Sequence, residues 1–323
     1  PAGKPDISGI DEGFSTYLRQ YFKAQELPTD EAVIGWNDGS LPSYHTMTWT
    51  SGNEFITAMY NRIYYQIGIC NEYIRETSDE KLVSRGITSP EIKMYRAEAR
   101  FLRALSYYHA LDMFGSVPFV TEKDAVGSFL PKQISKADLF AYIESELKAI
   151  EADMAEPRKN EYARADKAAA WTLLTKLYLN AEVYIGTGKY TEAITSAKKV
   201  IGAGYVLEAK YQNLFLADNN KSAEIIFPVA FDGTKTKTWG GMTFMVHAPV
   251  GGKMNPADFG IGGGWGGLRT TQQFVDHFDD KSGKTDSRAM FFTDGQNKEV
   301  ADISAFTDGY AITKYKNVTS TGV

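Results

Sequence analysis

Apolar residues recur at helical spacing along most of the first two thirds of the chain. Between residues 53 and 76 they return every three or four positions, at Phe55, Met59, Ile63, Ile67, Cys70 and Ile74. This spacing places them on one face of a helix. Further helices are predicted at "GFSTYLRQYFKA", "SKADLFAYIESELKAIEADM", "ADKAAAWTLLTKLYLNAEVYI" and "KYTEAITSAKKVIGAGY".

The segment "AEARFLRALSYYHALDMFGSVPFV", residues 97–120, predicts a packed helix with a defined end. An apolar stripe runs along this helix from Met94, and three arginines lie outside that stripe: Arg96, Arg100 and Arg103. Gly115 suits the left-handed position just past a helix end, and Pro118 cannot continue a helix. Ser135 is the predicted N-cap of the next helix. Helix, loop and helix together predict an antiparallel hairpin.

A second hairpin follows, with the turn "GTG" between its two helices. Trp171, Leu174 and Tyr178 stand at the spacing of the first helix of a tetratricopeptide repeat. Thr175 occupies the position that is usually Gly, and the turn is longer than in the standard repeat. The predicted fold is therefore mostly α, with tetratricopeptide-like hairpins packed as an α-α superhelix, since each hairpin buries its apolar face against a neighbour.

The character of the chain changes after Tyr205. "EIIFPVAFD" and "TFMVHAPV" predict strands, "TTQQFVDHFD" a short helix, and "GYAITKYKNVTSTGV" a strand that runs into a turn. Glycine dominates 260–267, which indicates positive φ or a close backbone approach there. We expect one domain over 1–323, with a helical core at 53–205 and a loop-rich, partly β region at 206–323.

Composition narrows the function classes. The 323 residues carry a net charge of −5 with no cluster of Lys and Arg, which argues against a nucleic-acid partner. A single cysteine, Cys70, excludes an intrachain disulfide and a multi-cysteine metal site. No apolar run reaches the roughly 18 residues that cross a bilayer. The chain starts at Pro1 without a signal peptide, and its last predicted strand has nothing after it to pair with, so we expect that both ends have been cut.

No motif indicates catalysis. The pattern Gly262-x-Gly264-x-x-Gly267 lacks the preceding hydrophobic strand of a dinucleotide site, and "SGKT" lacks the upstream glycine of a phosphate loop. "DHFDD" is a possible cation site, but solvated turn residues are the simpler interpretation. The histidines are scattered without metal-ligand spacing: His45, His109, His247 and His277. We expect no enzyme activity, cofactor or metal.

Tryptophans in loops are the candidate binding residues. Trp36 and Trp49 lie in a long N-terminal loop, and Trp239 and Trp265 lie beside glycines in the second half. A flat aromatic face accepts the C–H groups of a sugar ring, while amides and carboxylates bond its hydroxyls. The alternative interpretation is that these rings only pin long loops to the helices. The complete predicted glycan site is Asp30, Trp36, Asn37, Trp49, Asn53, Trp239 and Trp265.

The stretch "RAEARFLRALSYYHALDMFGSVPFVTE" closely resembles the signature of the SusD/RagB family of Bacteroidota surface lipoproteins. Other segments fit the family in the same order, among them "IYYQIGICNEYI", "YTEAITSAKKVI", "LFLADNNKSAEIIFPVAFD" and "GWGGLRTTQQFVDHFD". In the family, glycan contacts often come from the loop after an early Ser/Thr-Asp-Glu, here Thr29-Asp30-Glu31, and from tryptophans in later loops.

The resemblance implies binding rather than catalysis. Family members lie on the outer membrane, held by a lipidated N-terminal cysteine, and pass oligosaccharide or polysaccharide to a SusC-like TonB-dependent transporter. The lipidated cysteine is missing from this sequence, and Cys70 cannot replace it. The resemblance therefore predicts a surface-exposed glycan-binding protein, lipid-anchored in its full-length form. A tetratricopeptide-like scaffold that binds only peptide or protein remains the alternative.

Overall fold

The computed structural model describes residues 13–127, 129–236 and 238–322. These residues form two compact units, which we describe separately. Unit 1 holds the described residues up to Asn61, the segment Leu207–Ala223, and those from Ala230 onward. Unit 2 holds Arg62–Val206 and Glu224–Val229.

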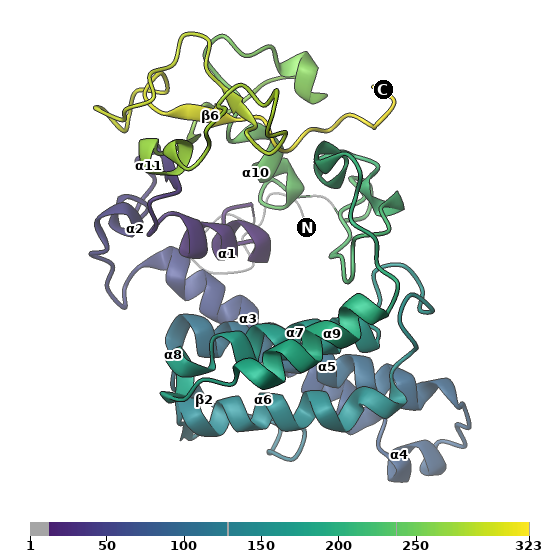
Figure 1. Ribbon diagram of the computed structural model, residues 1–323. Coiled ribbons are helices and arrows are strands. Elements are labelled where there is room, and N and C mark those ends of the chain that lie inside the picture. The colour runs from purple at the N-terminus through teal and green to yellow at the C-terminus, as the bar shows by residue number, and fades with distance from the viewer. Residues whose placement is uncertain (1–12, 128, 237, 323) are drawn as a thin grey trace. The chain divides into compact units, whose positions relative to one another are not determined.

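Unit 2 is helical. Its elements are most of α3 (Glu54–Glu76), α4 (Asp79–Ser84), α5 (Glu91–Phe114), α6 (Lys136–Ile150), η1 (Glu151–Asp153), α7 (Lys167–Leu179), α8 (Ala181–Ile185) and α9 (Tyr190–Gly202). Helices α6, α7 and α9 run alongside one another, in teal to green in Figure 1, and α5 packs against α6. The predicted mostly α fold of tetratricopeptide-like hairpins is confirmed, but the helix predicted over 165–185 is divided at Asn180 into α7 and α8.

The predicted helix boundaries of the first hairpin are confirmed by their caps. Gly115 has φ of 72°, and its N–H donates to the carbonyl of Leu111 at 3.0 Å. Strand β2 (Val117–Pro118) then begins, and it pairs with β3 (Gln133–Ile134). The Ser135 hydroxyl accepts a hydrogen bond from the Asp138 N–H at 3.1 Å, which caps α6.

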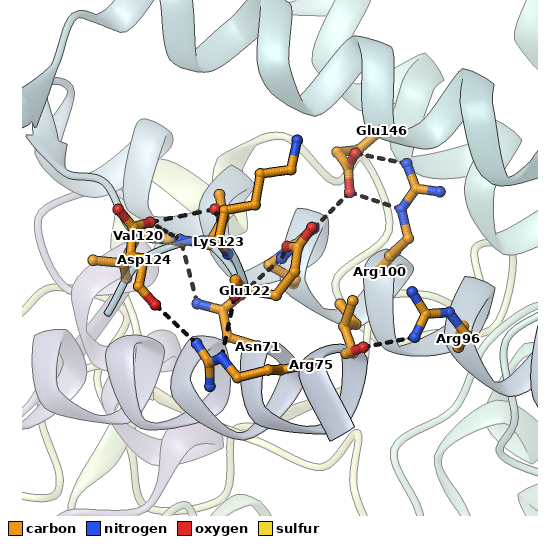
Figure 2. A network of polar contacts seen from close by, with 12 residues as sticks. Asn71, Arg75, Arg96, Arg100, Val120, Glu122, Lys123, Asp124 and Glu146 are labelled. Atoms are coloured by element: carbon orange, nitrogen blue, oxygen red, sulfur yellow. Dashed lines mark hydrogen bonds and ion pairs between the residues drawn. The ribbon is translucent and has the colours of Figure 1, made fainter. Parts of the chain in front are cut away.

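Arg103 and Arg100 of α5 build a polar network in unit 2, which the apolar pattern did not reveal. Arg103 is only 2% exposed, and it donates to Asn71 at 2.7 Å and to Glu146 at 2.9 Å. It also pairs with Glu122. Arg100 donates two hydrogen bonds to the same Glu146 carboxylate, at 3.0 and 2.7 Å, as Figure 2 shows. Helices α3, α5 and α6 are thereby joined by charge-assisted hydrogen bonds.

The segment that follows β2 is hydrogen-bonded to residues of the same network. The Tyr107 hydroxyl donates to the carbonyl of Val120 at 2.7 Å and accepts from the Val120 N–H at 2.9 Å. Asn71 donates to the same carbonyl, and Arg75 donates to the carbonyl of Glu122 (Figure 2). The backbone N–H and carbonyl of Val120 and the carbonyl of Glu122 therefore have hydrogen-bond partners although they lie outside a sheet.

Unit 1 is built around a small antiparallel sheet with strand order β1-β4-β6-β5. The strands are β1 (Ala32–Ile34), β4 (Leu268–Thr270), β5 (Phe291–Phe292) and β6 (Tyr310–Ile312). Around them lie α1 (Tyr17–Glu26), α2 (Pro42–Thr46), η2 (Tyr211–Phe215), η3 (Asn219–Lys221), α10 (Met242–His247), η4 (Pro256–Phe259) and α11 (Gln272–Asp276). In the parts of the chain that the structure describes, no helix has the length and hydrophobicity to cross a membrane.

Two strand predictions were wrong. "EIIFPVAFD" forms no strand. Pro228 lacks a backbone donor for a sheet ladder, and Phe227 packs edge-on against Phe101 at 5.2 Å instead. "TFMVHAPV" overlaps α10, where Phe244, Met245 and Val246 are all buried. Because such a short, fully buried run shows no alternation of apolar and polar residues, it does not distinguish a strand from a helix. The predicted helix α11 and terminal strand β6 are confirmed, and β6 pairs with both β4 and β5.

Replacing Arg103 by Met should lower the free energy of unfolding by about 3–5 kcal/mol, because Glu122 loses its cation, Asn71 loses a donor and Glu146 keeps only Arg100. Urea unfolding followed by far-ultraviolet circular dichroism measures this loss. Arg85→Met is the control, because Arg85 pairs with Glu76 at the protein surface and should change stability little. Equal losses in the two variants would contradict the importance of the buried network.

The same network predicts a pH dependence. Burial alone would raise the pKa of Glu146, but hydrogen bonds from Arg100 and Arg103 hold that pKa below its ordinary value. The unfolded chain therefore binds more protons, and the stabilisation present above the unfolded pKa of about 4.3 is lost as pH falls through the lower folded value. The difference in unfolding free energy between wild type and Glu146→Gln should be constant from about pH 7 to 5.5 and shrink below about pH 4.3. Urea titrations across this range test it, and a constant difference down to pH 3 would contradict it.

Candidate functional site

Three of the predicted tryptophans come together in unit 1. Trp36 follows β1 and Trp265 precedes β4, and these strands pair with Ile34 opposite Leu268. The ring centroids of Trp36 and Trp265 are 6.2 Å apart, and those of Trp239 and Trp265 are 6.4 Å apart. We call Trp36, Trp239 and Trp265 the tryptophan platform.

Gly267 makes room for the first ring of the platform. A Cβ added at Gly267 would lie 2.2 to 2.4 Å from atoms of the Trp36 indole, so the ring lies directly on the glycine backbone. The indole Nε1–H of Trp36 donates to the carbonyl of Trp265 at 3.2 Å. Trp36 is thus held in one orientation, and its polar atom is already engaged.

The glycine run is fastened to the end of α10 by its backbone. The N–H groups of Trp265, Gly266 and Gly267 donate to the carbonyls of His247, Val250 and Ala248 at 2.8 to 2.9 Å. A Cβ at Gly264 would lie 2.0 Å from the Val250 carbonyl oxygen, while Gly260 and Gly266 have φ of 66° and 57°. Both predicted reasons for glycine, close approach and positive φ, are confirmed. The run leads into strand β4 rather than into a helix, which does not suit a dinucleotide site.

A buried cation lies against the platform. Arg19 of α1 is 4% exposed, and its guanidinium carbon is 5.6 Å from the Trp36 ring centroid and 5.8 Å from that of Trp265. The rings of Phe14 and Phe244 lie nearer still, at 4.1 and 4.9 Å. Cation–π attraction from this one group holds rings from separate segments together.

One of the three rings of the platform is exposed to solvent. Trp239 is 61% exposed, whereas Trp36 and Trp265 are half-buried. His247 lies against Trp265, with ring centroids 5.1 Å apart and planes inclined by 31°. This arrangement offers an aromatic apolar surface with a polar neighbour, in which the planes of Trp36 and Trp239 are inclined to that of Trp265 by 55° and 46°. It suits binding of a ligand that has an apolar face and hydroxyl groups.

The other four predicted site residues are not tryptophans of the platform, and their surroundings differ. Asn53 is 2% exposed and caps α3, where its side-chain oxygen accepts from the N–H groups of Phe55 and Ile56 at 2.9 and 3.0 Å. Its side chain therefore serves to cap the helix and is not available to a ligand. Trp49 is 43% exposed and lies beside Tyr44 rather than within the platform. Asn37 is exposed and follows Trp36 directly.

Asp30 lines a cavity of about 800 Å³ in unit 1. Two of its cations already have partners: Arg288 donates twice to Asp286, and the Lys314 ammonium lies 4.3 Å from the Phe215 ring centroid. Burial, together with the neighbouring Glu31, raises the pKa of Glu26. The cavity carries no tryptophan, and we regard the platform as the stronger candidate site.

The described residues contain no cluster of three or more His, Cys, Asp or Glu side chains arranged to bind a metal ion. In the "DHFDD" segment the Asp280 carboxylate accepts hydrogen bonds from Ser282 and Thr285, as a turn residue does.

Sequence reasoning missed Arg19 and His247 as parts of the site. A polar residue in an amphipathic helix is ordinarily assigned to solvent, so nothing in the sequence singled out Arg19. His247 belongs to a segment that was predicted as a strand. The glycine run was the one available signal, because it indicated that another part of the chain must approach 260–267 closely.

Comparison with known proteins places the chain in a family. Residues 19–179 match the family model SusD-like_3, described as "Starch-binding associating with outer membrane". The chain is 37% identical over 369 residues to the starch-binding protein SusD of Bacteroides thetaiotaomicron, with 99% of this chain and 65% of that protein covered.

Solved structures agree on the fold. A SusD superfamily protein from Bacteroides thetaiotaomicron has a TM-score of 0.72 at 17% identity, covering 94% of this chain and 66% of that one. A structure with xylogluco-oligosaccharide has a TM-score of 0.67 at 20% identity, covering 88% and 57%. At these identities the likeness shows the fold alone. The chain spans about two thirds of the length of the curated starch-binding relative. The family model and the curated relative show that the chain belongs to the SusD-like family.

Proposed function

We propose that this chain binds carbohydrate, and that the tryptophan platform holds the sugar. The observation that carries the proposal is the convergence of Trp36, Trp239 and Trp265 in unit 1, with Trp239 left open. A sugar ring lies with its C–H groups on the indole and directs its hydroxyls toward the polar rim. The name of the curated relative, a starch-binding protein, supports an oligosaccharide as ligand.

The proposed task is uptake rather than cleavage. We propose that the full-length protein is lipid-anchored at the surface of the outer membrane and delivers oligosaccharide to a SusC-like TonB-dependent transporter. The description of the matching family, which associates with the outer membrane, supports this location. Binding by stacking and a few hydrogen bonds releases ligand readily, as delivery to a second protein requires.

A second candidate function is binding of a protein or peptide. Helix α9 exposes Tyr190, Ile194 and Ile201 on one face, with exposed fractions of 52%, 56% and 75%. Leu179 and Val183 are also exposed. Apolar residues grouped in this way often mark a protein interface. A silent glycan array, together with capture of a peptide or transporter, would favour this alternative.

Replacing Trp239 by Ala should weaken glycan binding at least about tenfold, because an anchor ring at the centre of an interface commonly contributes more than about 1.4 kcal/mol. Isothermal titration calorimetry measures this effect, with maltoheptaose as the first probe and a glycan array to find a better one. Tyr65→Ala is the matched control, because Tyr65 is an aromatic residue that is 69% exposed and belongs to unit 2. Its binding should equal that of wild type. Undiminished binding by Trp239→Ala would refute the platform as the site.

Gly267→Ala tests the platform without removing a tryptophan. The added Cβ would collide with the Trp36 indole, so we expect a changed near-ultraviolet circular dichroism spectrum and a loss of glycan binding. Gly262→Ala lies in the same run, where a Cβ meets no atom within 4 Å, and should leave both unchanged. If Gly267→Ala bound glycan as wild type does, the position of Trp36 would not matter for binding.

A further inference from the structure

His247 is held in one orientation beside the platform. Its ring lies against Trp265 at 5.1 Å, and its own carbonyl accepts the Trp265 N–H at 2.8 Å. On the other side, its Nδ1 is 2.7 Å from the carbonyl oxygen of Gly263. Contacts from the ring, the backbone and the side-chain nitrogen together leave the imidazole little freedom.

The hydrogen bond to Gly263 determines where the imidazole proton lies. A carbonyl oxygen only accepts hydrogen bonds, so Nδ1 must carry the proton. In the neutral ring, Nε2 then presents a lone pair and acts as an acceptor. The backbone of the glycine run thus sets the tautomer of a side chain next to the tryptophans.

Nε2 is open to a ligand. It makes no hydrogen bond within the described residues, and it does not belong to the buried polar atoms that lack a partner. It therefore reaches solvent while its ring lies on Trp265. An acceptor in this place complements the platform, because an indole N–H can only donate and that of Trp36 is already engaged with Trp265.

We propose that His247 determines specificity in glycan binding, with its Nε2 accepting a hydrogen bond from a hydroxyl of the sugar that lies against Trp239 and Trp265. This inference rests on the proposed function. Stacking alone recognises an apolar ring face and discriminates poorly between sugars that differ in one hydroxyl. A fixed acceptor favours the sugar whose hydroxyl points at it, because a wrong sugar leaves the acceptor unpaired.

Two substitutions test the roles of the two ring nitrogens separately. His247→Asn places an amide near the Nδ1 position, so the donor to Gly263 is kept and the acceptor is lost. His247→Gln extends an amide to about the Nε2 position, where its carbonyl oxygen can accept. We expect His247→Asn to weaken binding about fivefold, as loss of one hydrogen bond does, and His247→Gln to bind within about twofold of wild type.

The measurement is calorimetry on the full chain with maltoheptaose, or with the strongest glycan from an array if maltoheptaose gives no heat. Tryptophan fluorescence should be the same in both variants, which shows that the platform persists. Wild-type affinity in His247→Asn would overturn the inference, and so would equal losses in both variants, which would indicate that the ring only supports Trp265. A wild-type chain that binds no glycan at all would overturn the proposed function and this inference with it.

Discussion

The pairing of β1 with β4 is the constraint on which the proposed binding site depends. It joins segments more than 230 residues apart, with Ile34 opposite Leu268. Because the strands are antiparallel, the residues just beyond β1 meet those just before β4, and these are Trp36 and the end of the glycine run. The lack of a side chain at Gly267 then allows the indole to lie on the backbone. A short ladder of backbone hydrogen bonds thus positions a side-chain surface.

Unit 2 depends on buried charge in a different way. Its signature helix, α5, carries the buried Arg103 and the partly exposed Arg100, and Glu146 receives hydrogen bonds from both. Such a network fixes the positions of α3, α5 and α6 relative to one another. Removing any one of its residues is expected to cost a large part of the stability of this unit. The segment that identifies the family by its sequence therefore supports the helical unit. The proposed glycan contacts come from loops in unit 1.

Local signals predicted the local structure well. Ser135 and Gly115 were assigned to helix ends because capping depends on only a few neighbouring residues. Whether a polar residue is buried depends on partners that are far away in the sequence. Arg103 is buried because Glu122 and Glu146 meet it, and Asn53 serves as a cap although a polar residue beside Trp49 suggested a ligand contact. Periodicity also failed in 243–250, where the three consecutive residues Phe244, Met245 and Val246 of the short helix α10 are all buried.

The sequence predicted which types of residue form the candidate site, but only some of the individual residues. Trp36, Trp239 and Trp265 converge, whereas Asp30 lines a separate cavity. A crystal structure of the chain soaked with maltoheptaose tests the central claim most directly. We predict electron density for a glucose ring against the exposed face of Trp239, with a hydroxyl near His247. Density for the sugar in the cavity beside Asp30 instead would contradict the account.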